Sequence, residues 1–258
     1  MKELTISEMK RIQIEILNVI DEFCKKNKIR YSMGYGTLLG AIRHKGYIPW
    51  DDDLDIIMPY PDYCRFLNEF KHKDSYLKIQ SMLNDTSYRF PFAKVYDDRT
   101  LLLEKTIKTG VYIDVFPVVG FPKEEDFENF VKDYHKKYML LRSMTKRYNL
   151  NWFQKCLLLL KSLYTCSRKK IIEDIQNIYS RYPFDKAVNA GVIPNKYIKR
   201  RFFNADIFRH YALATFENRE YSALADYDTY LKGTYGNYMQ LPPEEKRHSE
   251  HIFKAYWK

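Results

Sequence analysis

Apolar residues recur at helical spacing soon after the chain begins. The repeating positions are Met9, Ile12, Ile16, Ile20 and Phe23. Thr5 and Glu8, just ahead of them, have the spacing of a capping box, in which each side chain bonds to the backbone N–H of the other residue. The pattern predicts an amphipathic N-terminal helix that packs its apolar face against the rest of the protein.

Short β-prone runs then alternate with segments of helical spacing. The pattern predicts, in order, a strand at 29–33, a helix at 37–44, a strand at 53–58, a helix at 60–70, and strands near 76–82, 90–96, 100–103 and 111–116. Beyond Pro122 the pattern becomes mostly helical. We therefore expect an α+β fold, with a small mixed sheet that carries the functional site on one edge, helices behind it and a mostly helical C-terminal half.

The most unusual stretch is the acidic run that precedes the expected strand at 53–58. It places Asp51, Asp52, Asp53 and Asp55 within five positions. Like charges this close raise one another's pKa unless a cation compensates, and Mg²⁺ or Mn²⁺ suits clustered carboxylates. Asp53 and Asp55 would project from one face of a strand, with Cα atoms roughly 7 Å apart. They could share metal ions, although an acidic turn that caps the next element is the simpler alternative.

A glycine-containing segment lies upstream of these acids. Residues 31–43 read as a strand-like run, then Gly34 and Gly36, then a short helical stretch. Glycine permits positive φ and close approach of the backbone, and the N–H groups at a helix start bind anions such as phosphate. Phosphoryl transfer needs both a phosphate cradle and a metal site, so the two motifs strengthen each other.

A third acid, Asp114, lies inside the apolar run 112–117. A buried carboxylate is costly unless it is paired or bound to a metal. Asp114 could instead bond to backbone at the end of a strand. Beside the acidic pair, we expect it to be a third metal ligand or the base for an acceptor hydroxyl.

Several segments together carry a family resemblance. They are Gly36–Gly46, Ile48–Ile56, Asp114–Pro117, Tyr235–Met239 and Pro242–Pro243. These segments resemble the LicD family of bacterial phosphocholine transferases, which are related to fukutin and fukutin-related protein. The resemblance runs from about Ile29 to His248, and it implies a nucleotidyltransferase-like fold.

The resemblance also implies roles for individual residues. Gly36 and Thr37 take the place of the family's Gly-Ser pair, Asp53 and Asp55 take that of the metal pair, and Asp114 that of the third acid. This chain departs from the pattern in two respects, since threonine replaces serine and the spacer to Asp53 is longer than usual. Thr37 keeps a hydroxyl and a backbone N–H.

Three further residues are candidates for phosphate or nucleotide binding. Arg43 ends the short helix, where it could contact donor phosphates or simply complement the helix C-terminus. Lys94 lies in a strand-like run where a solvated position is the alternative, but it matches a lysine in a similar LicD segment. For His248 we favour a hydrogen bond or nucleotide contact over a metal site. The 23 tyrosines could supply an aromatic box for a choline cation, or simply pack.

Length and charge agree with this interpretation. The 258 residues allow a nucleotidyltransferase-like catalytic core at 1–120 and a helical region at 121–258 that completes the substrate site. The net charge of +10 indicates an anionic partner without identifying it. The four cysteines lack zinc-site spacing and residues 1–11 do not resemble a signal peptide. We expect a cytoplasmic protein with reduced thiols.

The apolar segment 151–164 is interrupted by lysines and is too short for a membrane span of about 20 residues. Basic residues flank it, so it could lie at the surface of an anionic membrane, for example at the inner face of the bacterial cell membrane, or form a buried core helix. A buried core helix is at least as consistent with the pattern, while the acceptors of the LicD family, which are often lipid-linked glycans, add weight to the membrane interpretation.

The sequence thus predicts a Mg²⁺- or Mn²⁺-dependent transferase that resembles LicD. It would take phosphocholine, or a related phospho-alcohol, from CDP-choline or a similar donor to a sugar hydroxyl of a glycan such as lipopolysaccharide or a teichoic acid precursor. One alternative is a nucleotidyltransferase that moves a nucleotide. Another is a basic binding module with a degenerate site, which the intact acids argue against. No motif for nucleic acid is present in the sequence.

Overall fold

The computed structural model describes residues 1–70, 76–104, 107–145, 167–193, 201–248 and 254–258. Helix α1 (Ile6–Asn27) begins at the predicted capping box. The Thr5 hydroxyl oxygen accepts from the Glu8 N–H at 3.2 Å, and the Glu8 carboxylate accepts from the Thr5 N–H at 2.8 Å. Its buried face contains Ile12, Ile16 and Ile20, as the apolar pattern predicts.

A mixed sheet forms the centre of the molecule, and two parallel strands lie at its middle. These are β3 (Asp55–Pro59) and β8 (Tyr112–Phe121). The strands around them are antiparallel to their neighbours: β2 (Ser32–Met33) on β3, β5 (Ala93–Asp97) and β9 (Asn189–Gly191) on β8, β4 (Leu77–Gln80) on β5, and β10 (Phe203–Asn204) on β9. Strand β8 is long enough to pair with β5 along its first half and with β9 along its second.

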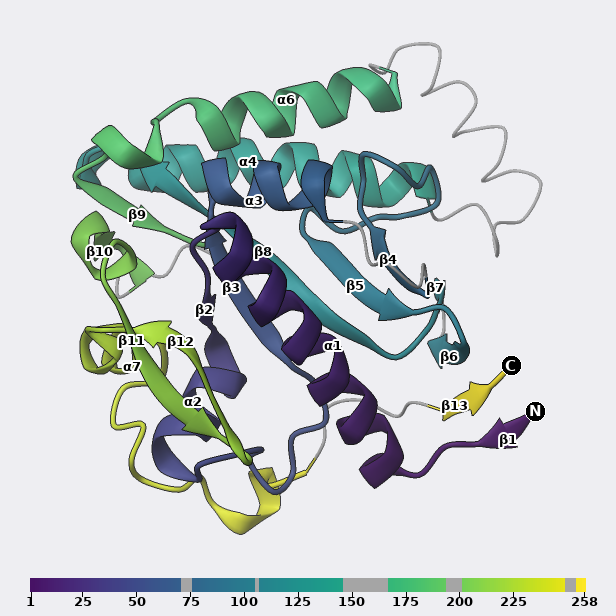
Figure 1. The fold of residues 1–258 in the computed structure, drawn as a ribbon. Coiled ribbons are helices and arrows are strands. Elements are labelled where there is room, and N and C mark those ends of the chain that lie inside the picture. Colours follow the sequence, from purple (N-terminus) through teal and green to yellow (C-terminus); the bar gives the residue numbers. More distant parts are fainter. Residues whose placement is uncertain (71–75, 105–106, 146–166, 194–200, 249–253) are drawn as a thin grey trace.

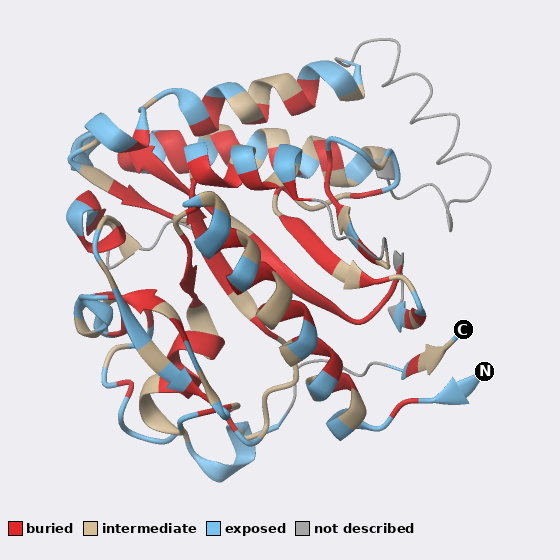
Figure 2. Ribbon diagram, viewed as in Figure 1, coloured by how far each residue is buried: buried red, intermediate tan, exposed pale blue. Residues whose placement is uncertain are grey.

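Helices cover this sheet and close two hydrophobic cores. Helices α1 and α3 (Tyr60–Glu69) contact β8 in the main core. Helices α4 (Glu124–Thr145) and α6 (Arg168–Ser180) pack on each other and on the end of β8 in a second core. Figure 2 shows the central strands almost wholly buried, while the helices are buried on one side only.

The remaining elements lie beside the central sheet. A small sheet brings the two chain ends together through the strands β1 (Lys2–Glu3), β13 (Lys254–Trp257), β6 (Thr100–Glu104) and β7 (Ile107–Thr109) (Figure 1). Helix α2 (Tyr35–Arg43) precedes β3, and a hairpin of β11 (Tyr211–Phe216) and β12 (Arg219–Leu224) lies against α2 and β2. Helix α7 (Tyr227–Tyr235) follows the hairpin.

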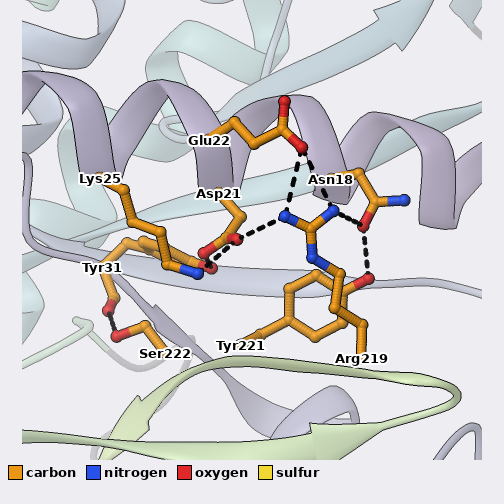
Figure 3. Close-up of polar contacts among 8 residues, drawn as sticks. All are labelled: Asn18, Asp21, Glu22, Lys25, Tyr31, Arg219, Tyr221 and Ser222. Carbon is orange, nitrogen blue, oxygen red and sulfur yellow. Dashed lines mark hydrogen bonds and ion pairs between the residues drawn. The ribbon is translucent and has the colours of Figure 1, made fainter.

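A polar network holds this hairpin on α1 (Figure 3). Asp21 of α1 is fully buried, and its carboxylate accepts hydrogen bonds from Tyr31 at 2.7 Å and Lys25 at 2.8 Å. Arg219 of β12 reaches the same carboxylate at 3.4 Å and also bonds to Glu22. A buried carboxylate is tolerated when it is paired and hydrogen-bonded, and here the pairing fixes the hairpin that flanks α2.

The α+β class predicted from the sequence is confirmed, and each element predicted before residue 117 has a counterpart within a few residues. After Pro122 the chain forms the expected helices but also the strands β9 to β13, which the pattern did not indicate. The expected boundary at residue 120 falls within β8. Segment 151–164 lies outside the described residues, and among those described no helix is long and apolar enough to cross a bilayer.

Candidate active site

Three charged side chains line up across neighbouring strands of the central sheet, and we call them the charged row. Asp55 of β3 pairs in register with Asp114 of β8, which in turn pairs with Lys94 of β5. The N–H of Asp114 donates to the Leu54 carbonyl at 2.9 Å, at the start of the parallel pairing. Residues in register point to the same face of a sheet. Two of the three predicted acids are therefore neighbours in space.

An acidic cluster precedes β3. Carboxylate oxygens of Asp51, Asp52 and Asp53 lie within 4.8 Å of one another. The charges of Asp51, Asp53 and Asp114 all act on Asp55. The cluster and the charged row thus form one acidic group. The sequence indicates Asp53, Asp55 and Asp114 as the site acids, and the structure adds Asp51 of the same acidic run to this group.

The electrostatics of this group fit a divalent cation. Desolvation raises the pKa of Asp55 well above its usual range, and the charges of Asp53, Asp114 and Asp51 raise it further. Desolvation is also the main cause that raises the pKa of Asp51. A cation beside such carboxylates would favour their ionised form. Oxygen ligands of this kind are those that Mg²⁺ and Mn²⁺ bind, so the residues present suit either metal.

Lys94, one of the phosphate candidates, forms a buried ion pair with Asp114. The distance from Nζ to Oδ1 is 2.6 Å, and the two side chains are only 4% and 11% exposed. The ammonium also lies 3.3 Å from the centre of the Tyr112 ring. The position is buried, not solvated, because β5 has strands on both sides. The charge of Lys94 is therefore directed to Asp114.

Thr37 bonds to the backbone of Asp55. Its hydroxyl oxygen accepts a hydrogen bond from the backbone N–H of Asp55 at 2.8 Å, and the residue is buried. This bond joins the first turn of α2 to the start of β3. Thr37 thus fixes the strand residue whose carboxylate lies in the charged row.

The glycines of this segment allow close approach and do not supply a positive φ. A Cβ at Gly34 would lie 2.7 Å from Ile57, and one at Gly36 would lie 2.5 Å from Oδ2 of Asp51. The φ of Gly34 is −125°, whereas Tyr35 between them has φ 40°. A left-handed tyrosine is strained, and strain of this kind gathers at functional sites. The carboxylate of Asp51 lies against Gly36, where the sequence suggested a phosphate cradle.

Arg43 connects α2 to the segment that follows α7. One of its guanidinium nitrogens donates to the carbonyls of Tyr238 at 2.5 Å and Gln240 at 3.5 Å. Desolvation lowers the pKa of Arg43 from its usual range. Arg43 therefore positions one wall of the site. His248, the last of the phosphate candidates, lines the same cavity.

Most of these residues line one cavity of about 1030 Å³, and the buried residues Thr37 and Lys94 are not part of its lining. The predicted residues that line the cavity are Gly36, Arg43, Asp53, Asp55, Asp114 and His248. Lining residues that the sequence had not singled out include Tyr35, Asp51, Arg201, Tyr235 and Lys246. Of those after Pro122, Tyr235 lies in a segment of the family resemblance. Arg201 and Lys246 carry no local signal, because folding alone brings them to the cavity.

The cavity also contains an aromatic row next to the charged row. Phe116 follows Asp114 by two residues on β8, so its side chain lies on the same face of the sheet. Its ring centre lies 4.4 Å from that of Phe92 and 5.2 Å from that of Tyr35. Phe90 extends the row, at 5.1 Å from Phe92. We define the aromatic row as these four residues, and all are only partly buried.

Comparison with known proteins agrees with this geometry. Residues 28–156 match the family model described as "LicD/FKTN/FKRP, nucleotidyltransferase domain". A "Lipopolysaccharide cholinephosphotransferase LicD" of Haemophilus influenzae is 32% identical over 265 residues, which cover 99% of each chain. An uncharacterized protein of Rickettsia typhi is 43% identical over 96 residues, or 37% of this chain and 28% of the relative. The chain belongs to the LicD family.

Proposed function

We propose that this protein transfers phosphocholine from CDP-choline to a sugar hydroxyl of a lipopolysaccharide or related cell-surface glycan. The name of the full-length Haemophilus influenzae relative supports the phosphocholine group and the lipopolysaccharide acceptor. The observation that carries the proposal is the pair of adjacent rows in one cavity. One row offers carboxylates for a metal, and the other offers aromatic rings for a cation.

The spacing of the two rows suits phosphocholine. Phe116 lies two positions after Asp114 on β8, so their Cα atoms are roughly 7 Å apart. In phosphocholine only two carbons separate the phosphate oxygen from the quaternary ammonium. A phosphate held near the acids would place the ammonium close to Phe116 and Phe92. Rings of this kind attract quaternary ammonium ions through cation–π contacts.

The acids would hold the cofactor proposed here. Asp51, Asp53, Asp55 and Asp114 would bind Mg²⁺ or Mn²⁺, which would neutralise charge on the diphosphate. Thr37 keeps the backbone of Asp55 in place for this role.

In the transfer step, the acceptor oxygen forms a bond to the phosphorus that carries choline, and the bond from that phosphorus to the bridging oxygen breaks. CMP leaves with the bridging oxygen and its electron pair. Asp114, oriented by its ion pair with Lys94, accepts the proton of the attacking hydroxyl.

We further propose that the enzyme acts at the cytoplasmic face of the membrane on a lipid-linked acceptor. The net charge of +10 supports contact with anionic lipids. Segment 151–164 remains the predicted contact.

Product analysis tests the proposed reaction. With CDP-choline, Mg²⁺ and a lipopolysaccharide acceptor, we expect CMP release and phosphocholine on the acceptor, measured by phosphorus NMR or mass spectrometry. Replacing Asp53 or Asp55 by alanine should reduce turnover by about 10³-fold. Asp133→Asn, which alters an exposed acid outside the cavity, is the matched control. Release of phosphocholine with CMP on the acceptor would show nucleotidyl transfer and refute the proposal, as would full activity in excess EDTA.

A second experiment tests the aromatic row. Phe116→Leu keeps an apolar side chain but removes the ring, so the preference for CDP-choline over CDP-ethanolamine should fall by about 10-fold. The rate with CDP-ethanolamine in the same variant is the internal control. An unchanged preference would remove Phe116 from headgroup recognition and leave the transferase assignment standing.

A further inference from the structure

Two of the phosphate candidates that the sequence suggested, Lys94 and Arg43, direct their charges to groups of the protein. Lys94 is paired with Asp114 at 2.6 Å, and its side chain is almost wholly buried. Arg43 directs its guanidinium to the carbonyls of Tyr238 and Gln240. Neither residue presents an uncommitted charge to a diphosphate in this arrangement. A different basic residue in the cavity wall is better placed.

Arg201 reaches the cavity from the edge of the central sheet. It stands two residues before Phe203, the first residue of β10, which pairs with β9. Strand β9 in turn pairs with the second half of β8, downstream of Asp114. Arg201 lines the same cavity as Asp55 and Asp114. No sequence motif marks this position.

The side chain of Arg201 lacks a hydrogen-bond partner that its chemistry requires. Its Nε–H is buried and finds no acceptor among the described residues, where no hydrogen bond or ion pair of its guanidinium is found either. A buried donor without an acceptor is destabilising, and such groups are rare in folded proteins. The arrangement is explained if a ligand in the cavity supplies the acceptor.

The charges of Arg201 and of Asp55 act on the same two tyrosines. Its guanidinium carbon is 5.9 Å from the centre of the Tyr35 ring. Desolvation raises the pKa of Tyr35 and of Tyr235, the Asp55 charge raises both further, and the Arg201 charge opposes the rise. Tyr35 and Tyr235 therefore both lie within the electrostatic reach of the Arg201 guanidinium and the Asp55 carboxylate. The negative charge of an anion bound between Arg201 and a metal ion on the acids would be neutralised by both cations.

We infer that Arg201 binds a phosphate group of the donor's diphosphate and positions it against the acidic group. A guanidinium presents several N–H donors in a plane that matches phosphate oxygens, so the contact is strong and directional. The inference rests on the proposed function, because it assigns a role in binding that donor. The competing role is packing of Arg201 on Tyr35 without contact to any ligand.

Binding measurements separate these two roles. Isothermal titration calorimetry with inorganic pyrophosphate and with CDP-choline, both in Mg²⁺, would compare the wild-type protein with Arg201→Gln and Arg201→Lys. We expect Arg201→Gln to weaken binding of both ligands about 10- to 100-fold, and Arg201→Lys to lose less because it keeps the charge. Arg181→Gln, which removes a surface arginine paired with Asp133, should bind as the wild-type protein does.

The outcomes distinguish this inference from the proposed function. Equal pyrophosphate affinity in wild-type and both Arg201 variants would overturn the phosphate role, as would a wild-type protein that does not bind pyrophosphate. Binding of pyrophosphate without binding of CDP-choline would overturn the proposed donor alone. Circular dichroism checks folding, and Arg201→Lys decides the result if Arg201→Gln is unfolded. In the transfer assay, the KM for CDP-choline should rise in Arg201→Lys. Because Tyr35 belongs to the aromatic row, the affinity for pyrophosphate, which lacks choline, separates a phosphate contact from a loss of packing on Tyr35.

Discussion

Replacing Thr37 by valine would test whether its hydroxyl serves the protein backbone or the donor. Valine has nearly the same shape but offers no acceptor to the N–H of Asp55, which now bonds to the hydroxyl at 2.8 Å. Thr37 is only 3% exposed, so water could not easily replace the lost acceptor. An unsatisfied buried N–H is destabilising by about 1–3 kcal/mol. For a chain of this size each kcal/mol lowers the unfolding temperature by about 2–4 °C.

The assay combines unfolding with kinetics. Urea unfolding followed by circular dichroism gives the free energy of unfolding, and Thr37→Ser is the control that keeps the hydroxyl while removing one methyl group, worth about 0.8 kcal/mol. Because Asp55 would be less firmly held, we expect kcat of Thr37→Val to fall with little change in the KM for the donor. If Thr37→Val is as stable as the wild-type protein and has a raised KM for the donor with an unchanged kcat, this reasoning is refuted, because that result would indicate that the hydroxyl contacts a donor phosphate.

Three other perturbations follow from single contacts. Gly36→Ala would place a Cβ 2.5 Å from Oδ2 of Asp51 and displace that carboxylate, so turnover should fall by about 10²-fold with little change in the unfolding midpoint; normal turnover would show that Asp51 is dispensable. Arg219→Gln removes one of the cations paired with the buried Asp21. Because the Arg219 side chain is 39% exposed and solvent screens its charge, we expect the free energy of unfolding in urea to fall by only about 1 kcal/mol, and an unchanged value would contradict the network in Figure 3. Hydrogen bonds, chiefly from the backbone N–H of Thr5, lower the pKa of Glu8 from 4.5 to about 2, so the stabilisation by its carboxylate is complete above pH 4.5 and is lost as pH falls toward 2. In thermal scans at a series of pH values, Glu8→Gln should therefore lose less stability on acidification than the wild-type protein, and an equal loss in both proteins would refute this.

Local chemistry made the first part of the chain predictable. The capping box at Thr5 and Glu8 needs only a spacing of three residues, and the apolar stripe behind it needs only the period of a helix. The run around Asp55 likewise predicted a strand at 53–58, and the observed strand begins at Asp55, so Asp53 precedes it instead of sharing its face. Helices and strands of this kind are decided by neighbours in sequence, so the α+β class and the order of elements up to residue 117 could be predicted from the sequence by itself.

The tertiary structure alone decided which charges meet. Lys94 and Asp114 form their ion pair because β5 and β8 take one register, and a shift of one residue would turn Lys94 to the other face. Arg43 bonds to carbonyls 195 and 197 residues away in sequence. Arg201, just before β10, lines the cavity because β10 pairs with β9 and β9 pairs with β8. The aromatic row, which no count of tyrosines could identify, also depends on strand pairing. Periodicity predicts whether a segment forms a helix or a strand, whereas the partners of a buried charge depend on how elements distant in sequence pack together.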